Sequence, residues 1–127
     1  MAGRITFRAG DVAVEQADAV VSGDDLVLDA STGPEALDAA LRAALRDALG
    51  RAAERGARTI AVPALGAGVV PLQRAAEVLL AEARAHLAGE TSLEEIRFVL
   101  SGEPALRVFE AVQDAFKIAQ QAQRWSS

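Results

Sequence analysis

One stretch of the chain constrains its fold more than any other: residues 59–71, which read Thr-Ile-Ala-Val-Pro-Ala-Leu-Gly-Ala-Gly-Val-Val-Pro. A short apolar run leads into a turn with two glycines, and Pro71 then opens an amphipathic segment. This order predicts a buried strand, a loop with exposed backbone amides, and a helix. Such a loop can bind an anion through its amides, or it can be a tight connection in which glycines permit close packing. The pattern alone leaves both interpretations open.

The rest of the chain repeats this alternation of strand and helix. Strand patterns are expected at residues 5–8, 19–21, 59–65 and 96–100, and helical patterns at residues 34–55, 71–87 and 104–119. The alternation predicts the α/β class, with a parallel or mixed sheet and right-handed crossovers that place helices on both faces. At 127 residues the chain is long enough for one core. We expect a single domain over residues 1–119 and a frayed polar tail over residues 120–127.

Three local expectations accompany this scheme. The helix at residues 34–55 would be roughly 33 Å long, about twice a typical strand, so Gly50 is expected to divide it. Asp38 and Arg42 are four residues apart, which predicts an ion pair on its outer side. Residues 90–95 are interpreted as a solvated turn, and His86 as a surface histidine at a helix end.

Composition excludes several classes of function. The chain has no cysteine and one histidine, which excludes disulfides and thiolate metal sites and argues against a histidine-based metal site. No metal or cofactor is expected. The net charge of −5 argues against nucleic acid as a partner. No apolar run is long enough to cross a membrane, and residues 1–4 lead into a strand without a signal-peptide pattern. A cytoplasmic location is therefore expected.

Four loops are expected to meet at one edge of the sheet. They are residues 10–12, 22–33, 66–70 and 101–102, and each follows a predicted strand. Between the second strand and Thr32, Leu26-Val27-Leu28 is interpreted either as a brief strand or as an anchor for its loop. Ligands of open α/β sheets bind beyond the carboxyl ends of the strands, so these loops form the predicted site.

Taken together, these motifs resemble the macro domain, an ADP-ribose-binding module. Gly10-Asp11-Val12 is similar to the family's Gly-Asp-Ile/Val, and residues 17–21, Ala-Asp-Ala-Val-Val, are similar to its (Val/Ala)-Asp-Ala-Ile-Val. Residues 59–69 are similar to Ser-Ile-Ala-Phe-Pro-Ala-Leu-Gly-Thr-Gly-Ile/Val. Pro71 and the pair Ala75-Ala76 match the residues that follow in the family.

The resemblance implies a role for each loop. Asp11 would accept a hydrogen bond from the adenine amino group, with the Val12 amide close to the ring; the alternative is that Asp11 only caps a turn. The backbone of the glycine loop would wrap the distal phosphate and ribose. The remaining loops would complete the pocket. The implied ligand-binding residues are Asp11, Val12, Ser22, Gly33, Gly66, Ala67, Gly68, Val69 and Ser101.

The chain also departs from the family pattern. Where the family has Asn-Ala-Ala-Asn, this chain has Ser22-Gly23-Asp24-Asp25, and an ionised Asp25 cannot donate a hydrogen bond. The family's glycine-rich loop has become residues 30–34, in which only Gly33 survives. Strands and helices that the family places before the residue 59 strand are missing. The expected fold is thus a three-layer α/β/α macro-domain-like arrangement with a reduced mixed sheet of four or five strands.

Three functions follow from these features. The first is a module that binds ADP-ribose or a related small nucleotide with weakened or absent catalysis. The second is a hydrolase of ADP-ribosylated substrates or O-acetyl-ADP-ribose, in which Asp24 or Asp25 positions a water. The third is a scaffold without a ligand that acts through protein interaction. Loss of strands can expose an edge or an apolar face, so a homodimer is also expected.

Overall fold

The protein is an α/β structure with eight described elements. The computed structural model describes residues 3–21, 33–66 and 68–126, and of residues 124–126 it describes the backbone only. The elements are β1 (Arg4–Ala9), the single helical turn η1 (Val12–Val14), β2 (Ala19–Val20), α1 (Pro34–Glu54), β3 (Thr59–Val62), α2 (Leu72–Ala88), β4 (Glu95–Leu100) and α3 (Glu103–Ser126). Of the described helices, none combines the length and apolar character that a membrane span requires.

The strands form one four-stranded sheet in the order β1-β4-β3-β2. All three described pairings are parallel, with Phe7 opposite Phe98 and Ile60 opposite Ile96. The predicted α/β class and the small sheet are confirmed. A mixed sheet was expected, but antiparallel pairing is absent from the strands that the structure describes.

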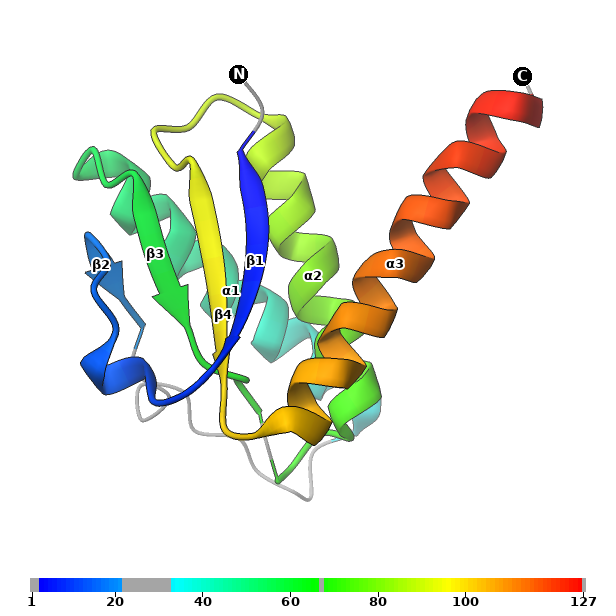
Figure 1. The fold of residues 1–127 in the computed structure, drawn as a ribbon, viewed down its shortest axis with the longest axis horizontal. Helices are drawn as coiled ribbons and strands as arrows, with labels where there is room; N and C mark the ends of the chain where they lie inside the picture. Colours follow the sequence, from blue (N-terminus) through cyan, green and yellow to red (C-terminus); the bar gives the residue numbers. More distant parts are fainter. Residues whose placement is uncertain (1–2, 22–32, 67, 127) are drawn as a thin grey trace.

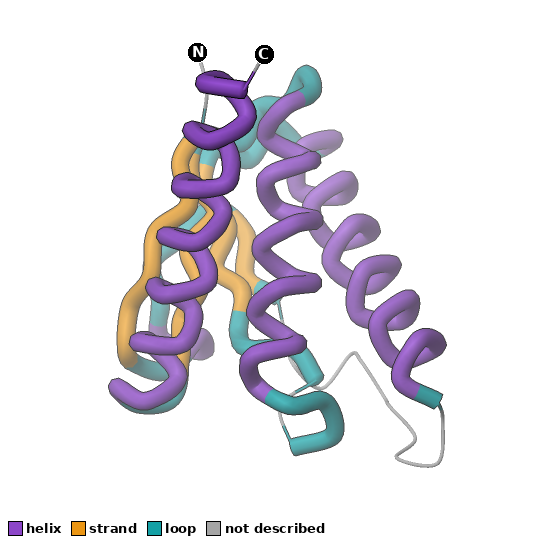
Figure 2. The backbone as a smooth tube through the Cα atoms, turned by 90° about the vertical axis from the view of Figure 1, so that its right-hand side faces the viewer, coloured by secondary structure: helices purple, strands orange, loops and turns teal. Residues whose placement is uncertain are grey.

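The helices α1 and α2 lie behind the sheet, and α3 runs beside β1 and packs on α2 (Figures 1 and 2). The steps from β2 to β3 and from β3 to β4 move across the sheet in one direction, so right-handed crossovers place α1 and α2 on the same face. The step from β1 to β2 moves the opposite way and crosses the other face. Within the described residues, the third layer of the expected arrangement is only this connection, residues 10–18, with η1.

The core lies between the sheet and the helices. Phe98 and Phe109 are fully buried with ring centroids 5.5 Å apart, and Phe7 packs beside them. The predicted leucine stripe of α1 is also buried: Leu37, Leu41, Leu45 and Leu49. Burial of this stripe over about three turns stabilises α1 as one helix.

Three local expectations are wrong. Gly50 lies inside an uninterrupted α1, because packing of the leucine stripe outweighs the weak helix propensity of one glycine. Asp38 is buried and forms its ion pair with Arg74 of α2 rather than lying on the outer surface. The last helix does not end near residue 119 but continues through Ser126.

Candidate functional site

The carboxyl ends of β1, β4 and β3 lie at one edge of the sheet, where the loops after Ala9, Leu100 and Val62 begin (Figure 1). The Gly10 amide extends the sheet by donating to the Leu100 carbonyl at 2.9 Å. Three of the four predicted loops are therefore brought together in their described parts.

The glycine loop after β3 has a backbone that only glycine adopts readily. Gly66 and Gly68 have φ of +81° and +88°, in the left-handed region. The Gly66 carbonyl accepts from the amides of Val69 at 3.1 Å and Val70 at 2.9 Å, which closes the loop. Acceptors for the amides of Gly66 and Gly68 are absent among the described residues. These two amides are therefore the donors that the described loop can offer to an anion.

The loop is anchored on the core at both ends. Leu65 and Val70 are buried, and Val69 packs partly against the core. Gly68 is exposed, and a Cβ built on it would meet no atom within 4 Å. A rigid base and an open tip are what a backbone anion site requires, because the donors are then oriented before the ligand arrives.

Asp11 lies at the start of η1 and is exposed. Its Oδ1 accepts a hydrogen bond from the Ala13 amide at 2.9 Å, so the side chain caps the turn. Its second oxygen, Oδ2, accepts no hydrogen bond from residues 3–21, 33–66 or 68–126. Since a carboxylate accepts several hydrogen bonds, this oxygen is available to a donor on a ligand. Val12, the first residue of η1, is half-buried.

The other predicted residues have different positions. Gly33 is the exposed N-cap of α1, with its carbonyl accepting from Leu37 at 3.0 Å. Ser101 is exposed directly after β4. The remaining predicted residues lie outside the described residues: Ser22, Asp24, Asp25 and Ala67.

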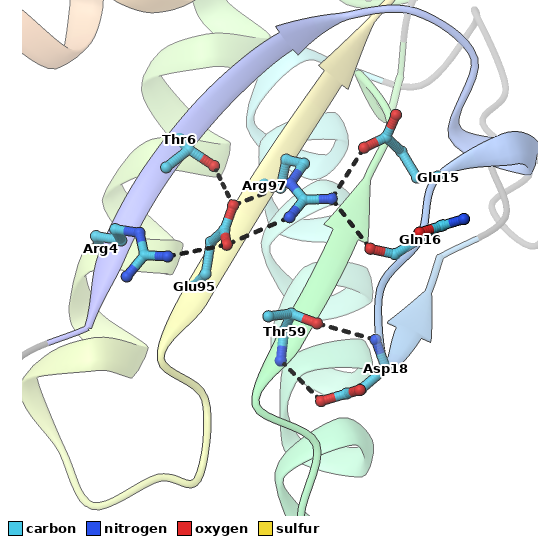
Figure 3. A network of polar contacts seen from close by, with 8 residues as sticks. All are labelled: Arg4, Thr6, Glu15, Gln16, Asp18, Thr59, Glu95 and Arg97. Carbon is cyan, nitrogen blue, oxygen red and sulfur yellow. Dashed lines mark hydrogen bonds and ion pairs between the residues drawn. The ribbon is translucent and has the colours of Figure 1, made fainter.

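A network of charged side chains holds the connection after β1 on the open face of the sheet (Figure 3). Arg97 of β4 donates to Glu15 Oε1 at 2.9 Å and to the Gln16 carbonyl at 3.2 Å. Its Nε also donates to Glu95 Oε2 at 2.9 Å, and Thr6 donates to the same oxygen at 2.7 Å. Through Glu15 and Gln16, the network fixes the chain that leads away from Asp11.

The electrostatics of this network favour its charged form. Hydrogen bonding from Arg97, opposed by burial and helped by Thr6, holds the pKa of Glu95 below its usual value. The bonds to Glu95 and Glu15 raise the pKa of Arg97. Glu95 is only 7% exposed and opens β4, and Leu93 is also buried, so the expectation of a solvated turn over residues 90–95 is wrong at these two residues.

Sequence reasoning did not identify the residues of this network. A signal was present, since Arg4 and Thr6 alternate with apolar residues in one strand, and Glu95 and Arg97 do so in its neighbour. Polar residues at every second position of two adjacent parallel strands predict a polar face with opposite charges side by side.

Asp18 has a structural role. Its Oδ2 accepts from the amides of Arg58 at 2.9 Å and Thr59 at 3.4 Å, and its own amide donates to Thr59 Oγ1 at 2.9 Å (Figure 3). These bonds join the start of β2 to the start of β3. The motif at residues 17–21 thus aligns two strands whose far ends carry the predicted site.

The environment of His86 also differs from its prediction. His86 is half-buried, with its Nε2 2.8 Å from Thr91 Oγ1, and burial lowers its pKa; it is less exposed than expected.

A cavity of about 490 Å³ lies between β2 and α1, lined by Val21, Ala48, Arg51 and others. Its described lining includes none of the predicted ligand-binding residues.

Comparison with known proteins identifies the class of fold. The Trypanosoma brucei macrodomain in complex with ADP-ribose superposes with a TM-score of 0.68 at 20% identity, over 84% of this chain and 68% of that chain. The same macrodomain in complex with ADP gives 0.69 and 20%, over 85% and 68%. The Oceanobacillus iheyensis macrodomain with ADP gives 0.63 and 18%, over 70% and 47%. The chain therefore has the macrodomain fold.

The sequence points to the same family. A Macro domain family model matches residues 27–79, a stretch that contains the whole glycine-loop motif. No curated protein matches the chain. Together with the fold, the family model confirms the resemblance to a macro domain that the motifs predicted. The chain spans about half the length of the Oceanobacillus protein and about two thirds of the Trypanosoma protein.

Proposed function

We propose that this chain binds ADP-ribose or a related small nucleotide at the carboxyl edge of its sheet. The observation that carries the proposal is the glycine loop, in which the left-handed Gly66 and Gly68 offer backbone amides beside an exposed tip. Macrodomains of the same fold are crystallised with ADP and ADP-ribose, which supports this class of ligand. An acidic protein can bind a phosphate in this way because the donors are backbone amides.

The two ends of the nucleotide are assigned by chemistry. Asp11 Oδ2, which has no hydrogen-bond partner among the described residues, accepts a hydrogen bond from the adenine amino group, an arrangement that favours an amino purine over an oxo purine. The Val12 amide lies beside the ring. The glycine loop, Gly66 to Val69 with Ala67, takes the distal phosphate and ribose. Ser22, Gly33 and Ser101 complete the pocket from the neighbouring loops.

Titration calorimetry with ADP-ribose tests the proposal, and Asp11 offers a sharp pair of variants. Asp11→Asn keeps an oxygen that can cap the Ala13 amide, whereas Asp11→Ala loses both the cap and the ligand acceptor. Loss of a charged hydrogen bond is worth about 1.5–3 kcal/mol, so both variants should bind at least about tenfold more weakly. Only Asp11→Ala should also lower thermal stability. Absence of binding heat at millimolar ADP-ribose would falsify the proposal.

The proposed module binds without efficient turnover. Asp25 stands where the family has the final Asn of its Asn-Ala-Ala-Asn motif, and its carboxylate neither donates to a ribose hydroxyl nor attracts a diphosphate. Incubation with O-acetyl-ADP-ribose tests this directly. Turnover that disappears in Asp25→Ala would instead support the hydrolase, with Asp24 or Asp25 positioning the water.

Two further outcomes remain measurable. A nucleotide panel that gives no thermal stabilisation would support the ligand-free scaffold, because a ligand of the folded state must raise its stability. The homodimer stays a prediction. In its described part, the sheet face opposite α1 and α2 carries ion pairs rather than an apolar patch. Its test is the mass in solution as a function of concentration.

A further inference from the structure

A second cleft lies at the opposite end of the sheet from the glycine loop. It is formed by the start of β1, the last turn of α2 and the middle of α3, and its volume is about 420 Å³. In Figure 1, α3 leans away from α2 towards its carboxyl end. β1 separates the cleft from Gly10 by its full length of six residues, about 17–20 Å. The cleft is therefore independent of the proposed nucleotide site.

The charged side chains in the described lining of this cleft are all cationic. Arg4, Arg84 and Lys117 line it, and carboxylates are absent from its described lining. This is unusual for a chain with a net charge of −5. Lys117 is the only lysine in the sequence, and it forms none of the ion pairs described between residues of the structure. Arg4 is partly neutralised by Glu95 at 3.3 Å.

Arg84 is held in a fixed orientation. Its Nη2 donates to Gln120 Oε1 at 3.0 Å, and its guanidinium carbon lies 5.5 Å from the centre of the Phe116 ring. A guanidinium positioned in this way loses little further freedom when an anion binds, and its remaining donors match a carboxylate or a phosphate.

A largely buried amide side chain belongs to the same cleft. Gln113 lines the cleft and is 8% exposed, yet its Oε1 is buried without a hydrogen-bond partner. This oxygen has almost no accessible surface, so the proposal below rests on the cationic side chains of the cleft and not on Gln113. The same cleft is also lined by Ile5 and Leu87, which offer apolar contact.

We propose that this cleft binds a small organic anion. Its acidic group, a carboxylate or a phosphate, pairs with Arg84 and Lys117, and its hydrocarbon part lies against Ile5 and Leu87. Aromatic residues are absent from the described lining, so stacking of a nucleobase is not favoured there. The ligand therefore differs from the nucleotide proposed for the glycine loop.

The single lysine makes the test selective. Reductive methylation with ¹³C-formaldehyde labels Lys117 and the terminal amine, and dimethyl-lysine keeps its positive charge. NMR titrations would use hexanoate, glycerol phosphate and inorganic phosphate, with hexanol as the neutral control. We expect a saturable shift of the Lys117 signal with at least one organic anion and none with hexanol.

The three anions distinguish the possible ligands. Saturation with hexanoate alone assigns a carboxylate, and saturation with glycerol phosphate assigns a phosphate ester. No saturable shift with either organic anion at about 10 mM, or a response to inorganic phosphate alone, would overturn the proposal. A ligand with a dissociation constant above about 10 mM would bind too weakly to support a specific site.

A matched pair of variants separates the cleft from general charge. Arg84→Gln should weaken binding at least about fivefold, as expected for loss of a charged hydrogen bond. Arg107→Gln changes the net charge equally, but Arg107 pairs with Glu103 at 3.7 Å and does not line the cleft, so its affinity should stay within about twofold. Equal weakening in both variants would refute a specific site.

Two further measurements control for misfolding of a variant and for an effect on the nucleotide site. Lys117→Gln, at an exposed position, repeats the test by calorimetry if Arg84→Gln does not fold. ADP-ribose affinity should be unchanged in either variant, because the two sites lie at opposite ends of the sheet. The anion site can therefore fail while nucleotide binding stands, and the reverse also holds.

Discussion

Replacement of Glu95 by glutamine is the most informative perturbation of the fold. The buried carboxylate accepts hydrogen bonds from Arg97 at 2.9 and 3.3 Å, from Thr6 at 2.7 Å and from Arg4 at 3.3 Å. Glutamine has nearly the same shape but only one acceptor oxygen and no charge, and its amino group would face arginine donors.

The expected cost follows from these contacts. The Arg4 contact adds little because 69% of its side chain is exposed. The Arg97 contacts and the Thr6 contact join a charged group in a buried setting, where each is worth about 1.5–3 kcal/mol before the cost of burying the charge is subtracted. We therefore expect Glu95→Gln to lower the free energy of unfolding by about 2–3 kcal/mol at pH 7, a large part of the 5–15 kcal/mol typical of a domain.

The same reasoning fixes the pH dependence. The pKa of Glu95 is lowered in the folded state from a usual value of 4.5. Its stabilisation is therefore complete above the unfolded pKa and is lost as the pH falls through the folded pKa. The difference in stability between the wild type and Glu95→Gln should accordingly shrink below about pH 4.5.

Urea denaturation followed by far-ultraviolet circular dichroism at pH 7, 5, 4 and 3 would measure both effects. Asp47→Asn is the control, because Asp47 forms an exposed pair with Arg51 at 3.1 Å and should cost less than about 0.5 kcal/mol. The reasoning is refuted if Glu95→Gln is as stable as this control, or if its difference from the wild type does not vary with pH.

Three smaller predictions concern the loop and α1, and thermal or urea denaturation checks each. Gly68→Ala should cost about 1–2 kcal/mol through its φ of +88° alone, since its Cβ meets no atom; an unchanged stability would contradict the left-handed loop. Gly50→Ala, in the interior of α1 with open space around its Cβ, should instead stabilise the protein by about 0.5–1 kcal/mol; a loss would mean that α1 is interrupted there. Asp38→Asn should destabilise more than Asp47→Asn, because Asp38 is buried against Arg74 and its pKa is lowered mainly by that side chain; equal effects would argue against the pair.

The sequence predicted the helices and strands well where one periodic pattern determined them. The leucine stripe of α1 and the apolar run before Pro63 are local signals, and both elements form where they were expected. Contacts between elements were predicted less well from the sequence. Asp38 has Arg42 one turn away in sequence, yet it pairs with Arg74, thirty-six residues away, because α1 and α2 pack face to face.

The candidate site was predicted through motifs rather than through physical patterning. Two glycines with positive φ could be anticipated from a glycine-punctuated turn. The ion pair between Arg97 and Glu15, which holds the chain after Asp11, could not be anticipated. These residues are 82 positions apart, and their contact can be inferred only when the strand order β1-β4-β3-β2 is known. Strand order depends on all crossovers together, and a single sequence does not specify it.

That strand order also has a consequence for the route of folding. β2, β3 and β4 each join their neighbour through one helical crossover, but β1 pairs only with β4, and Arg4 lies opposite Glu95. Closing so long a loop is entropically costly, so we expect β2 to β4 with α1 and α2 to assemble first and β1 to dock last. During synthesis, Arg4 of β1 would leave the ribosome 91 residues before Glu95, its partner in β4. Pulse-labelling hydrogen exchange should then show late protection of β1 amides, whereas simultaneous protection of β1 and β3 would indicate a single concerted step.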